Sequence, residues 1–347
     1  MTDAVVLKNI DIVYGARPQR AFPLIDQGMD RDEISTRTSL IAGALDASIT
    51  VEEGELLVLM GLSGSGKSTL LRAVNGLAPV VRGSVTVQTA RGPVDPYKAS
   101  PKVLRDLRLS TVSMVFQQFA LLPWRTVADN VGFGLELAGV ADSERRRAVD
   151  EQLELVNLTN WGSHKVSELS GGMQQRVGLA RAFATRAPIL LMDEPFSALD
   201  PLIRARLQDE LLEFQRRLKK TIIFVSHDLD EAFRIGNRIA IMDGGRIVQC
   251  GTPRDILDNP ANQHVADFIA GMNPISLLTA ADVMRPGIPQ DRTARVAATA
   301  QPQTPLADVI DALARHPGVI GVVDKGSILG AIDSNDVVRG LSRYRRR

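Results

Sequence analysis

The chain has 347 residues, 44% hydrophobic and 23% charged, an ordinary composition for a globular protein with room for two domains. A net charge of +1 excludes the basic excess that general nucleic-acid binding requires, so we expect no nucleic-acid partner. Because no apolar stretch reaches the length of a membrane span and no signal-type pattern opens the sequence, we expect neither insertion nor export. The single cysteine, Cys250, fits a reducing compartment and a structural role.

A phosphate-binding pattern, G-x-x-x-x-G-K-S, spans residues 61–68 and follows the apolar run 55–60, which predicts a strand. Glycines let successive N–H groups turn toward a phosphate, and the helix predicted after the pattern adds partial positive charge there. We expect Lys67 to bind the β- and γ-phosphates of a nucleoside triphosphate. The expected nucleotide-binding residues of this loop are Gly61, Ser63, Gly64, Ser65, Gly66, Lys67, Ser68 and Thr69.

Two further patterns follow along the chain. A helical stretch opens with Ser170, Gly171 and Gly172, where an anion can approach bare backbone at a helix N-terminus. The apolar run 189–192 then predicts a buried strand that ends in Asp193 and Glu194. We expect Asp193 to hold Mg²⁺ and Glu194 to polarise the attacking water of a hydrolysis reaction.

These patterns, in this order, resemble those of the ATP-binding-cassette (ABC) ATPases. Residues 169–174 resemble the signature motif of that family, and residues 197–200 resemble its D-loop. Gln117, after a strand predicted at 112–116, resembles the Q-loop glutamine, and His227, after a strand predicted at 221–226, resembles the switch histidine. The resemblance implies ATP and Mg²⁺ as cofactors, with catalytic roles for Glu194, His227 and Gln117, metal contacts from Ser68, Gln117 and Asp193, and ATP contacts from Ser170, Gly171, Gly172, Gln174 and Asp200.

The N-terminal segment indicates which group of ABC ATPases the chain resembles. Tyr14 resembles the aromatic residue that stacks on adenine in this family. The strand before the phosphate loop follows only after an insertion, residues 16–48, in which residues 30–38 predict a helix. With the motifs at 60–66, 196–204 and 226–232, this insertion resembles the ATPase subunit of quaternary-amine uptake systems, which import glycine betaine, choline or proline betaine.

That resemblance implies ATP hydrolysis that drives import of a quaternary amine from the cytoplasmic face of the inner membrane. It implies a head-to-tail homodimer, two permease subunits and, indirectly, a substrate-binding protein. The low aromatic content, 4%, offers no cage for a quaternary ammonium, which fits recognition by a separate subunit. We expect residues 118–139 to meet the permease, although core packing is the competing explanation for the side chains of Phe119, Leu122, Trp124 and Phe133.

Two alternatives remain open for the function. One is an importer for histidine or proline-type amino acids, and the other is a regulatory ATP-dependent clamp that dimerises without transport. The presence of Glu194 and His227 argues against the clamp, because a cassette that does not hydrolyse ATP often lacks one of them.

We therefore expect an α/β protein with an ABC-type P-loop ATPase domain, residues 1–275, that contains a helical signature subdomain at about 118–184. Residues 276–347 are expected to form a small α+β domain, with residues 286–305 as a loop, helices at 306–314 and 335–341, and strands at 320–323 and 327–332. This domain resembles one CBS (cystathionine-β-synthase-type) repeat, and we expect two copies to pair in the homodimer.

Two details of this domain concern its ligands. Asp333 stands where the CBS family has Ser or Thr, and its carboxylate would repel a phosphate, which argues against nucleotide sensing. A basic tail ends the sequence and predicts either contact with anionic lipid or a solvated end. The residues of this tail are Arg343, Arg345, Arg346 and Arg347.

Overall fold

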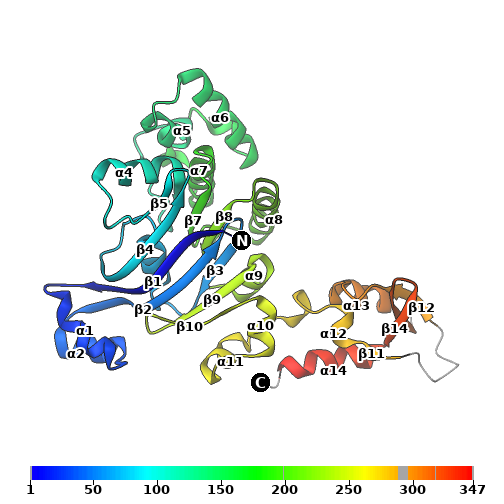
Figure 1. Cartoon of the computed structure of the whole chain (residues 1–347). Helices are drawn as coiled ribbons and strands as arrows, with labels where there is room; N and C mark the ends of the chain where they lie inside the picture. The colour runs from blue at the N-terminus through cyan, green and yellow to red at the C-terminus, as the bar shows by residue number, and fades with distance from the viewer. Residues whose placement is uncertain (1, 198, 288–295, 317, 346–347) are drawn as a thin grey trace. The chain divides into compact units, whose positions relative to one another are not determined.

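The computed structural model describes residues 2–197, 199–287, 296–316 and 318–345. Ala198 of the expected D-loop and Arg346 and Arg347 of the basic tail lie outside the described residues. The chain divides into two compact units (Figure 1). The first unit comprises Met1–His227 and Asn237–Cys250, and the second comprises Asp228–Gly236 and Gly251–Arg347. The expected domain boundary at 275 remains a proposal.

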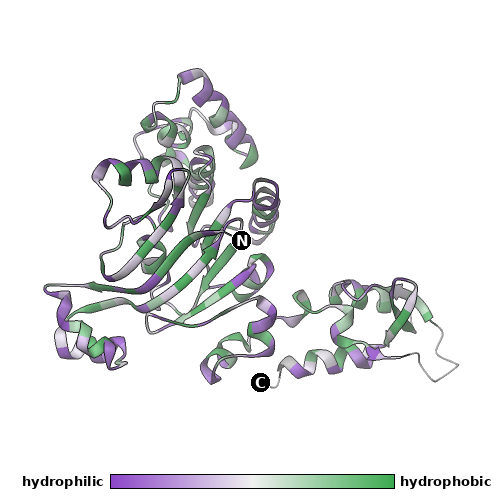
Figure 2. Cartoon of the chain, in the orientation of Figure 1, coloured by the Kyte–Doolittle hydropathy of each residue, from purple (hydrophilic) through white to green (hydrophobic). Residues whose placement is uncertain are grey.

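A six-stranded sheet forms the centre of the first unit, in the order β10-β9-β3-β8-β7-β6. The strands β9, β3, β8, β7 and β6 run parallel. Every residue of β3, β8 and β7 is buried, as expected for parallel strands covered on both faces, and Figure 2 shows apolar residues along them. The bounds are β3 Leu56–Met60, β6 Val112–Val115, β7 Ile189–Asp193, β8 Thr221–Val225, β9 Arg238–Asp243 and β10 Arg246–Gly251.

A second, antiparallel sheet has the order β2-β1-β4-β5. Its strands are β1 Asp3–Tyr14, β2 Ile41–Glu52, β4 Val80–Thr89 and β5 Gly92–Val94. Helix α3, Lys67–Ala73, follows β3 of the first sheet in the chain and precedes β4 of the second. It contributes Leu70 and Leu71 to a core cluster that also contains Ile12 from β1 and Leu57 from β3. This shared core fixes the start of α3, and with it the phosphate loop, against both sheets.

The segment between β1 and β2 contains three short helical pieces. The structure places η1 Pro18–Ala21, α1 Phe22–Asp26 and α2 Arg31–Thr38 there, but β2 already begins at Ile41. The expected insertion 16–48 therefore includes the first part of a strand, whose pairing with β1 a sequence pattern does not reveal. Helix α2 matches the helix predicted at 30–38, because Asp30 caps it in a reciprocal capping box with Glu33.

The helical part of the first unit contains α5 Val127–Leu137, α6 Asp142–Leu155 and α7 Gly171–Ala184, with the short η3 Thr159–Trp161 and η4 Val166–Glu168 between the last two. Val131 from α5, Leu153 from α6 and Val177 from α7 are buried in one cluster, while Figure 2 shows polar residues along α6. The remaining helices of this unit are α4 Pro101–Asp106, η2 Leu107–Thr111, which is a π-helical turn, and α8 Pro201–Leu218.

The second unit contains a four-stranded sheet in the order β11-β14-β13-β12. The expectation that residues 286–305 form only a loop is wrong, because β12 pairs in parallel with β13. Its sequence, VAATA, is short and weakly apolar, so only the main-chain ladder identifies it as a strand. The strands are β11 Arg285–Pro286, β12 Val296–Ala300, β13 Val319–Asp324 and β14 Ser327–Ile332; the helices are α9 Leu229–Ile235, α10 Pro253–Asp258, α11 Gln263–Ile269, η5 Pro274–Ser276, α12 Ala280–Val283, α13 Leu306–Arg315 and α14 Ser334–Arg345.

Asp333 has a structural partner in this unit. Its backbone N–H donates to Asp336 Oδ2 at 2.9 Å, and the Asp336 N–H donates to Asp333 Oδ1 at 2.9 Å. The guanidinium of Arg285 bonds both carboxylates, at 2.6 and 2.9 Å. Burial alone would raise the pKa of Asp333, but the Asp336 N–H and the charge of Arg285 hold that pKa below its ordinary value. The carboxylate therefore stabilises the first turn of α14.

None of the described helices combines the length and the apolar composition that a bilayer span requires.

We expect Asp333→Ala to lower the free energy of unfolding of the second unit by about 1 kcal/mol, because it removes a helix cap. The pKa of Asp333 is lowered in the folded state, so its stabilising effect is complete above the ordinary pKa of Asp and disappears as the pH falls through the lowered value. Scanning calorimetry between about pH 2 and about pH 6, which brackets the lowered pKa and the ordinary one, tests this. Asp324→Asn, at an exposed strand end, is the control; equal acid sensitivity of Asp333→Ala and wild type would contradict the role.

Candidate functional site

Four neighbouring parallel strands of the six-stranded sheet carry predicted site residues at the same edge. The phosphate loop follows β3, His227 follows β8, Asp193 ends β7 with Glu194 after it, and Gln117 follows β6. Because parallel strands present their carboxyl ends at one edge, residues from distant parts of the sequence meet there.

The phosphate loop is packed so closely that two of its glycines have no room for a side chain. A Cβ atom on Gly61 would lie 2.1 Å from the carbonyl oxygen of Met242, and one on Gly66 would lie 2.2 Å from that of Gly43. Both glycines also have positive φ angles, +142° and +102°. The N–H of Gly245 donates to the carbonyl of Ser65 at 3.1 Å, so strand β2 and the β9–β10 turn support the loop from outside.

Lys67 is buried under this loop, with 6% of its surface exposed. Its Nζ donates to the carbonyl oxygens of Gly61 at 2.8 Å and Leu62 at 2.9 Å. Burial lowers the pKa of the Lys67 ammonium, and the negative charges of Glu194 and Asp193 oppose that shift. The structure thus fixes a cation beneath the backbone N–H groups of the loop.

Asp193 links the loop helix to the central sheet. It is fully buried, and its Oδ1 accepts a hydrogen bond of 2.6 Å from Ser68 Oγ, while its Oδ2 forms an ion pair of 2.9 Å with Arg72. The sequence analysis missed Arg72. Its spacing of four residues from Ser68 on α3, which places both side chains on one helix face, is the signal that identifies it.

The carboxylate of Glu194 contacts the other two predicted catalytic residues, Gln117 and His227. Its Oε2 accepts a hydrogen bond of 3.1 Å from Gln117 Nε2 and lies 3.4 Å from His227 Nδ1. Glu194 has a φ angle of +49°, unusual for a residue with a side chain, and its carbonyl accepts bonds from Ser197 Oγ and Gln175 Nε2 at 3.1 and 3.4 Å. These bonds hold the strained backbone, so the carboxylate has one defined position at the sheet edge.

The expected signature residues do not meet the phosphate loop within the described chain. Ser170 caps α7 by accepting a hydrogen bond of 3.4 Å from the Met173 N–H, and Gln174 Nε2 donates to carbonyls of the preceding segment. Asp200 likewise caps α8, accepting from the Ile203 N–H at 3.0 Å. Among residues 2–197 and 199–250, no hydrogen bond or ion pair joins Ser170, Gly171, Gly172 or Gln174 to residues 61–68.

The segment after Gln117 is tied to α7 by Arg181, which the sequence analysis also missed. Phe119 and Ala120 have positive φ angles, and Arg181 donates to the carbonyl oxygens of both at 2.7 Å. Burial lowers the pKa of this guanidinium. Of the side chains expected to meet a permease, Trp124 is 72% exposed, whereas Phe119, Leu122 and Phe133 are half-buried, the last beneath the guanidinium of Arg125.

Tyr14 lies near the start of α3. The place that a Cβ would take on Gly43 is 3.1 Å from Tyr14 Cε2 and 2.7 Å from Thr69 Cγ2, so both side chains border the same glycine. The Tyr14 side chain is partly exposed. The ring therefore lies beside the first turn of the loop helix without being packed in the core, and its role in stacking on a base stays a prediction.

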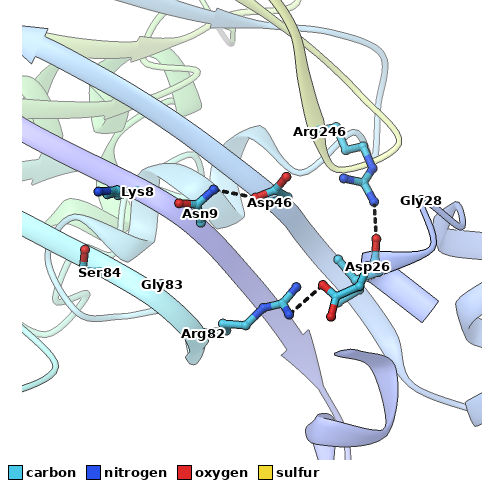
Figure 3. Close-up of a pocket in the computed structure, with 10 residues that line it drawn as sticks. Lys8, Asn9, Asp26, Gly28, Asp46, Arg82, Gly83, Ser84 and Arg246 are labelled. Atoms are coloured by element: carbon cyan, nitrogen blue, oxygen red, sulfur yellow. Dashed lines mark hydrogen bonds and ion pairs between the residues drawn. The ribbon is translucent and has the colours of Figure 1, made fainter. Parts of the chain in front are cut away.

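A cavity of about 750 Å³ lies away from these residues, between α1 and the antiparallel sheet (Figure 3). Arg82 forms an ion pair of 2.7 Å with Asp26 and also bonds Asp11, and Arg246 donates to the carbonyl of Ile25 at 3.2 Å. None of the predicted site residues lines this cavity. Its polar groups instead attach the insertion to the sheet.

The fold and the phosphate loop together define a P-loop nucleotide-binding protein. The family model that describes ABC transporters matches residues 45–197. Over 80% of this chain and 69% of the relative, the sequence is 51% identical to the glycine betaine/proline betaine transport system ATP-binding protein ProV of Escherichia coli. It is 41% identical to the glycine betaine transport ATP-binding protein OpuAA of Bacillus subtilis, over 95% of this chain and 78% of that one.

Among solved structures, the dimeric ATP-binding cassette MJ0796, in a post-hydrolysis state bound to ADP and Pi, aligns with a TM-score of 0.62 and 30% identity, covering 72% of this chain and 99% of that one. The chain therefore belongs to the ABC transporter family, as an ATP-binding protein. The resemblance to ABC ATPases that the motifs indicated, and the ATPase fold that it implied, are confirmed.

The packing of the loop glycines leads to a paired test. Gly66→Ala should abolish nucleotide binding, because a methyl group would displace the loop from β2, whereas Gly92→Ala tests a similar φ angle, +109°, with nothing within 4 Å of the new atom. The control should retain nucleotide binding and lose about 1–2 kcal/mol of stability from strain alone. Isothermal titration with ATP distinguishes the two; equal affinities would refute the steric argument.

Proposed function

We propose that this chain is the ATPase subunit of an importer for a quaternary amine such as glycine betaine or choline, hydrolysing ATP to drive a membrane permease from the cytoplasmic face of the membrane. The observation that carries the proposal is the single sheet edge at which Lys67, Asp193, Glu194 and His227 meet. The names of the relatives, which are ATP-binding proteins of glycine betaine transport systems, support the substrate class.

The chemistry follows from the positions of these groups. The loop N–H groups and Lys67 would bind the β- and γ-phosphates, where they stabilise the negative charge of the transition state. Tyr14 would stack on the adenine. Glu194 would accept the proton of the attacking water, and His227, beside the same carboxylate, would hold its orientation and contact the γ-phosphate.

Mg²⁺ fits the residues at the loop. Ser68 Oγ and Asp193 Oδ1 lie 2.6 Å apart, and hydroxyl and carboxylate oxygens are ligands that Mg²⁺ prefers, together with phosphate oxygens and water. Gln117, whose amide lies at the Glu194 carboxylate, would approach the same ion. The ion would neutralise charge on the phosphates; the chain supplies its placement.

A head-to-tail homodimer would complete the site. Helix α7 opens with Ser170, Gly171 and Gly172, which among the described residues make no hydrogen bond to the phosphate loop of their own chain. Nothing lies within 4 Å of a Cβ placed on Gly171, so a phosphate has room to approach. Leu62 in the loop and Leu202 beyond Asp200 are exposed apolar side chains of the kind that an interface covers. Gln174 and Asp200 would then act across this interface on the ATP held by the partner.

The exposed Trp124 supports contact between residues 118–139 and two permease subunits. Arg181 would transmit changes at Gln117 to α7, because it bonds the two residues that follow the Q-loop. A substrate-binding protein outside the membrane would select the solute. Pairing of the CBS-like residues 276–347 in the dimer, and contact of the basic tail with anionic lipid, belong to the same proposal.

Glu194→Gln should bind ATP with nearly wild-type affinity, form a stable ATP-bound dimer and lose almost all turnover, because the amide cannot accept the proton. Size-exclusion chromatography with ATP and a phosphate-release assay measure both effects. Lys67→Ala is the contrasting variant, since it should weaken nucleotide binding itself. Unchanged steady-state hydrolysis in Glu194→Gln would remove this residue from the role of general base.

Transport is tested in source cells that carry Lys67→Ala, by uptake of labelled glycine betaine, choline and histidine at two osmolarities. We expect loss of glycine betaine or choline uptake, with a larger difference at high osmolarity, and no effect on histidine. Selective loss of histidine uptake would reassign the substrate class. If none of the three changes, the non-transport clamp becomes the better explanation.

A further inference from the structure

Arg31, the first residue of helix α2 in the insertion, contacts the phosphate loop. The guanidinium Nη1 donates a hydrogen bond to the carbonyl oxygen of Gly64, the central glycine of the loop. The aliphatic part of the side chain passes the β9–β10 turn, where Arg31 Cδ lies 3.5 Å from the place that a Cβ would take on Gly245. Arg31 is therefore the insertion's direct contact with the nucleotide-binding backbone.

The position of Arg31 is fixed by the packing behind it. It is the first residue of α2, directly after the cap Asp30, and Ile34, one turn later, is fully buried. Ile34 belongs to a small core whose members come from the insertion and from β1 and β2: Val13, Ala21, Ile25, Ile34, Leu40, Ala42 and Leu45. The ion pair of Arg82 with Asp26 attaches the same insertion to the sheet (Figure 3).

The contact constrains one peptide group of the loop. The peptide between Gly64 and Ser65 is planar, so a donor that holds its carbonyl on one side directs the Ser65 N–H to the other. In the structure this N–H donates to the carbonyl of Leu62 at 3.1 Å, and Lys67 Nζ bonds the same oxygen at 2.9 Å. The Ser65 N–H and the Lys67 ammonium thus converge on one acceptor inside the loop.

A phosphate is the natural replacement for that acceptor, because its oxygens carry more negative charge than a carbonyl. A cation bound to the far side of the peptide polarises the group and strengthens its N–H as a donor. Arg31 also brings a second feature: its Nε is buried and has no hydrogen-bond partner among the described residues. The guanidinium also adds positive potential next to the phosphate site.

We infer that Arg31 is a positioning residue for the nucleotide, through which the insertion sets the orientation of the Gly64–Ser65 peptide and raises the affinity for ATP phosphates. This inference rests on the ATP binding of the proposed function. Among the described residues, no hydrogen bond or ion pair joins Arg31 to Glu194, so its effect belongs to binding and not to the hydrolytic step.

The test compares Arg31→Ala with Arg37→Ala in the full chain. Arg37 lies on the same helix, is exposed and carries the same charge, so its removal controls for the general loss of a cation from α2. Arg31→Ala should raise the Kd for Mg-ATP about ten-fold, the effect of one charge-assisted hydrogen bond. It should raise KM for ATP similarly and change kcat less than about two-fold, whereas Arg37→Ala should leave both at wild-type values.

Hydrogen exchange provides a second measurement. ATP should slow the exchange of amides 30–38 in wild type, because a nucleotide that orders the loop also orders Arg31 and α2, and it should not do so in Arg31→Ala. Arg31→Lys, which retains the charge, should recover part of the affinity and replaces Arg31→Ala in both measurements if the alanine variant does not fold.

The outcomes separate the two proposals. Failure of wild type to bind ATP would contradict the proposed function itself. Binding by wild type together with equal Kd values for Arg31→Ala and Arg37→Ala would overturn the inference alone. A loss confined to kcat would also overturn it, because a positioning role at the phosphate loop must appear in KM.

Discussion

A buried carboxylate, Asp193, supports the rest of this site. It ends strand β7 and is bound by Ser68 and Arg72, one turn apart on α3, so the helix that carries the phosphate loop is fixed to the sheet. An unpaired carboxylate in such a place would cost several kcal/mol. Both partners lie on the loop helix, so the position of the loop depends on Asp193. The burial of the Asp193 carboxylate in turn depends on the two side chains that this helix supplies.

From this fixed point the site extends along the sheet in both directions. Toward β6, the Glu194 carboxylate contacts Gln117, and Arg181 of α7 bonds the carbonyl oxygens of Phe119 and Ala120 in the segment that follows. Toward β8, the same carboxylate meets His227. Glu194 thus contacts residues that follow two different strands of the sheet, and Arg181 joins the segment after β6 to α7.

The sequence was sufficient for the parts of this structure that local patterns determine. The strands before the loop, before Asp193 and before His227 are continuous apolar runs, and the glycines of the loop are needed by its backbone. Strand β12 was missed because its short, small-residue sequence becomes a strand only through pairing with β13. Arg72, Arg181 and Arg31 were missed for a related reason: helical spacing can place Arg72 on the same face as Ser68, but the role of each arginine follows from the carboxylate or carbonyl that the tertiary fold places opposite it.

The ends of the insertion lie side by side, since Tyr14 pairs with Ile41 and Val13 with Ala42 in the ladder of β1 and β2. The inserted helices therefore occupy the position of a hairpin turn. Lengthening such a turn costs little closure entropy and leaves the register of the two strands unchanged. A cassette can gain or lose this segment without rebuilding its sheet. The segment that carries Arg31 can therefore vary in length while the sheet edge that carries Asp193, Glu194 and His227 keeps its geometry.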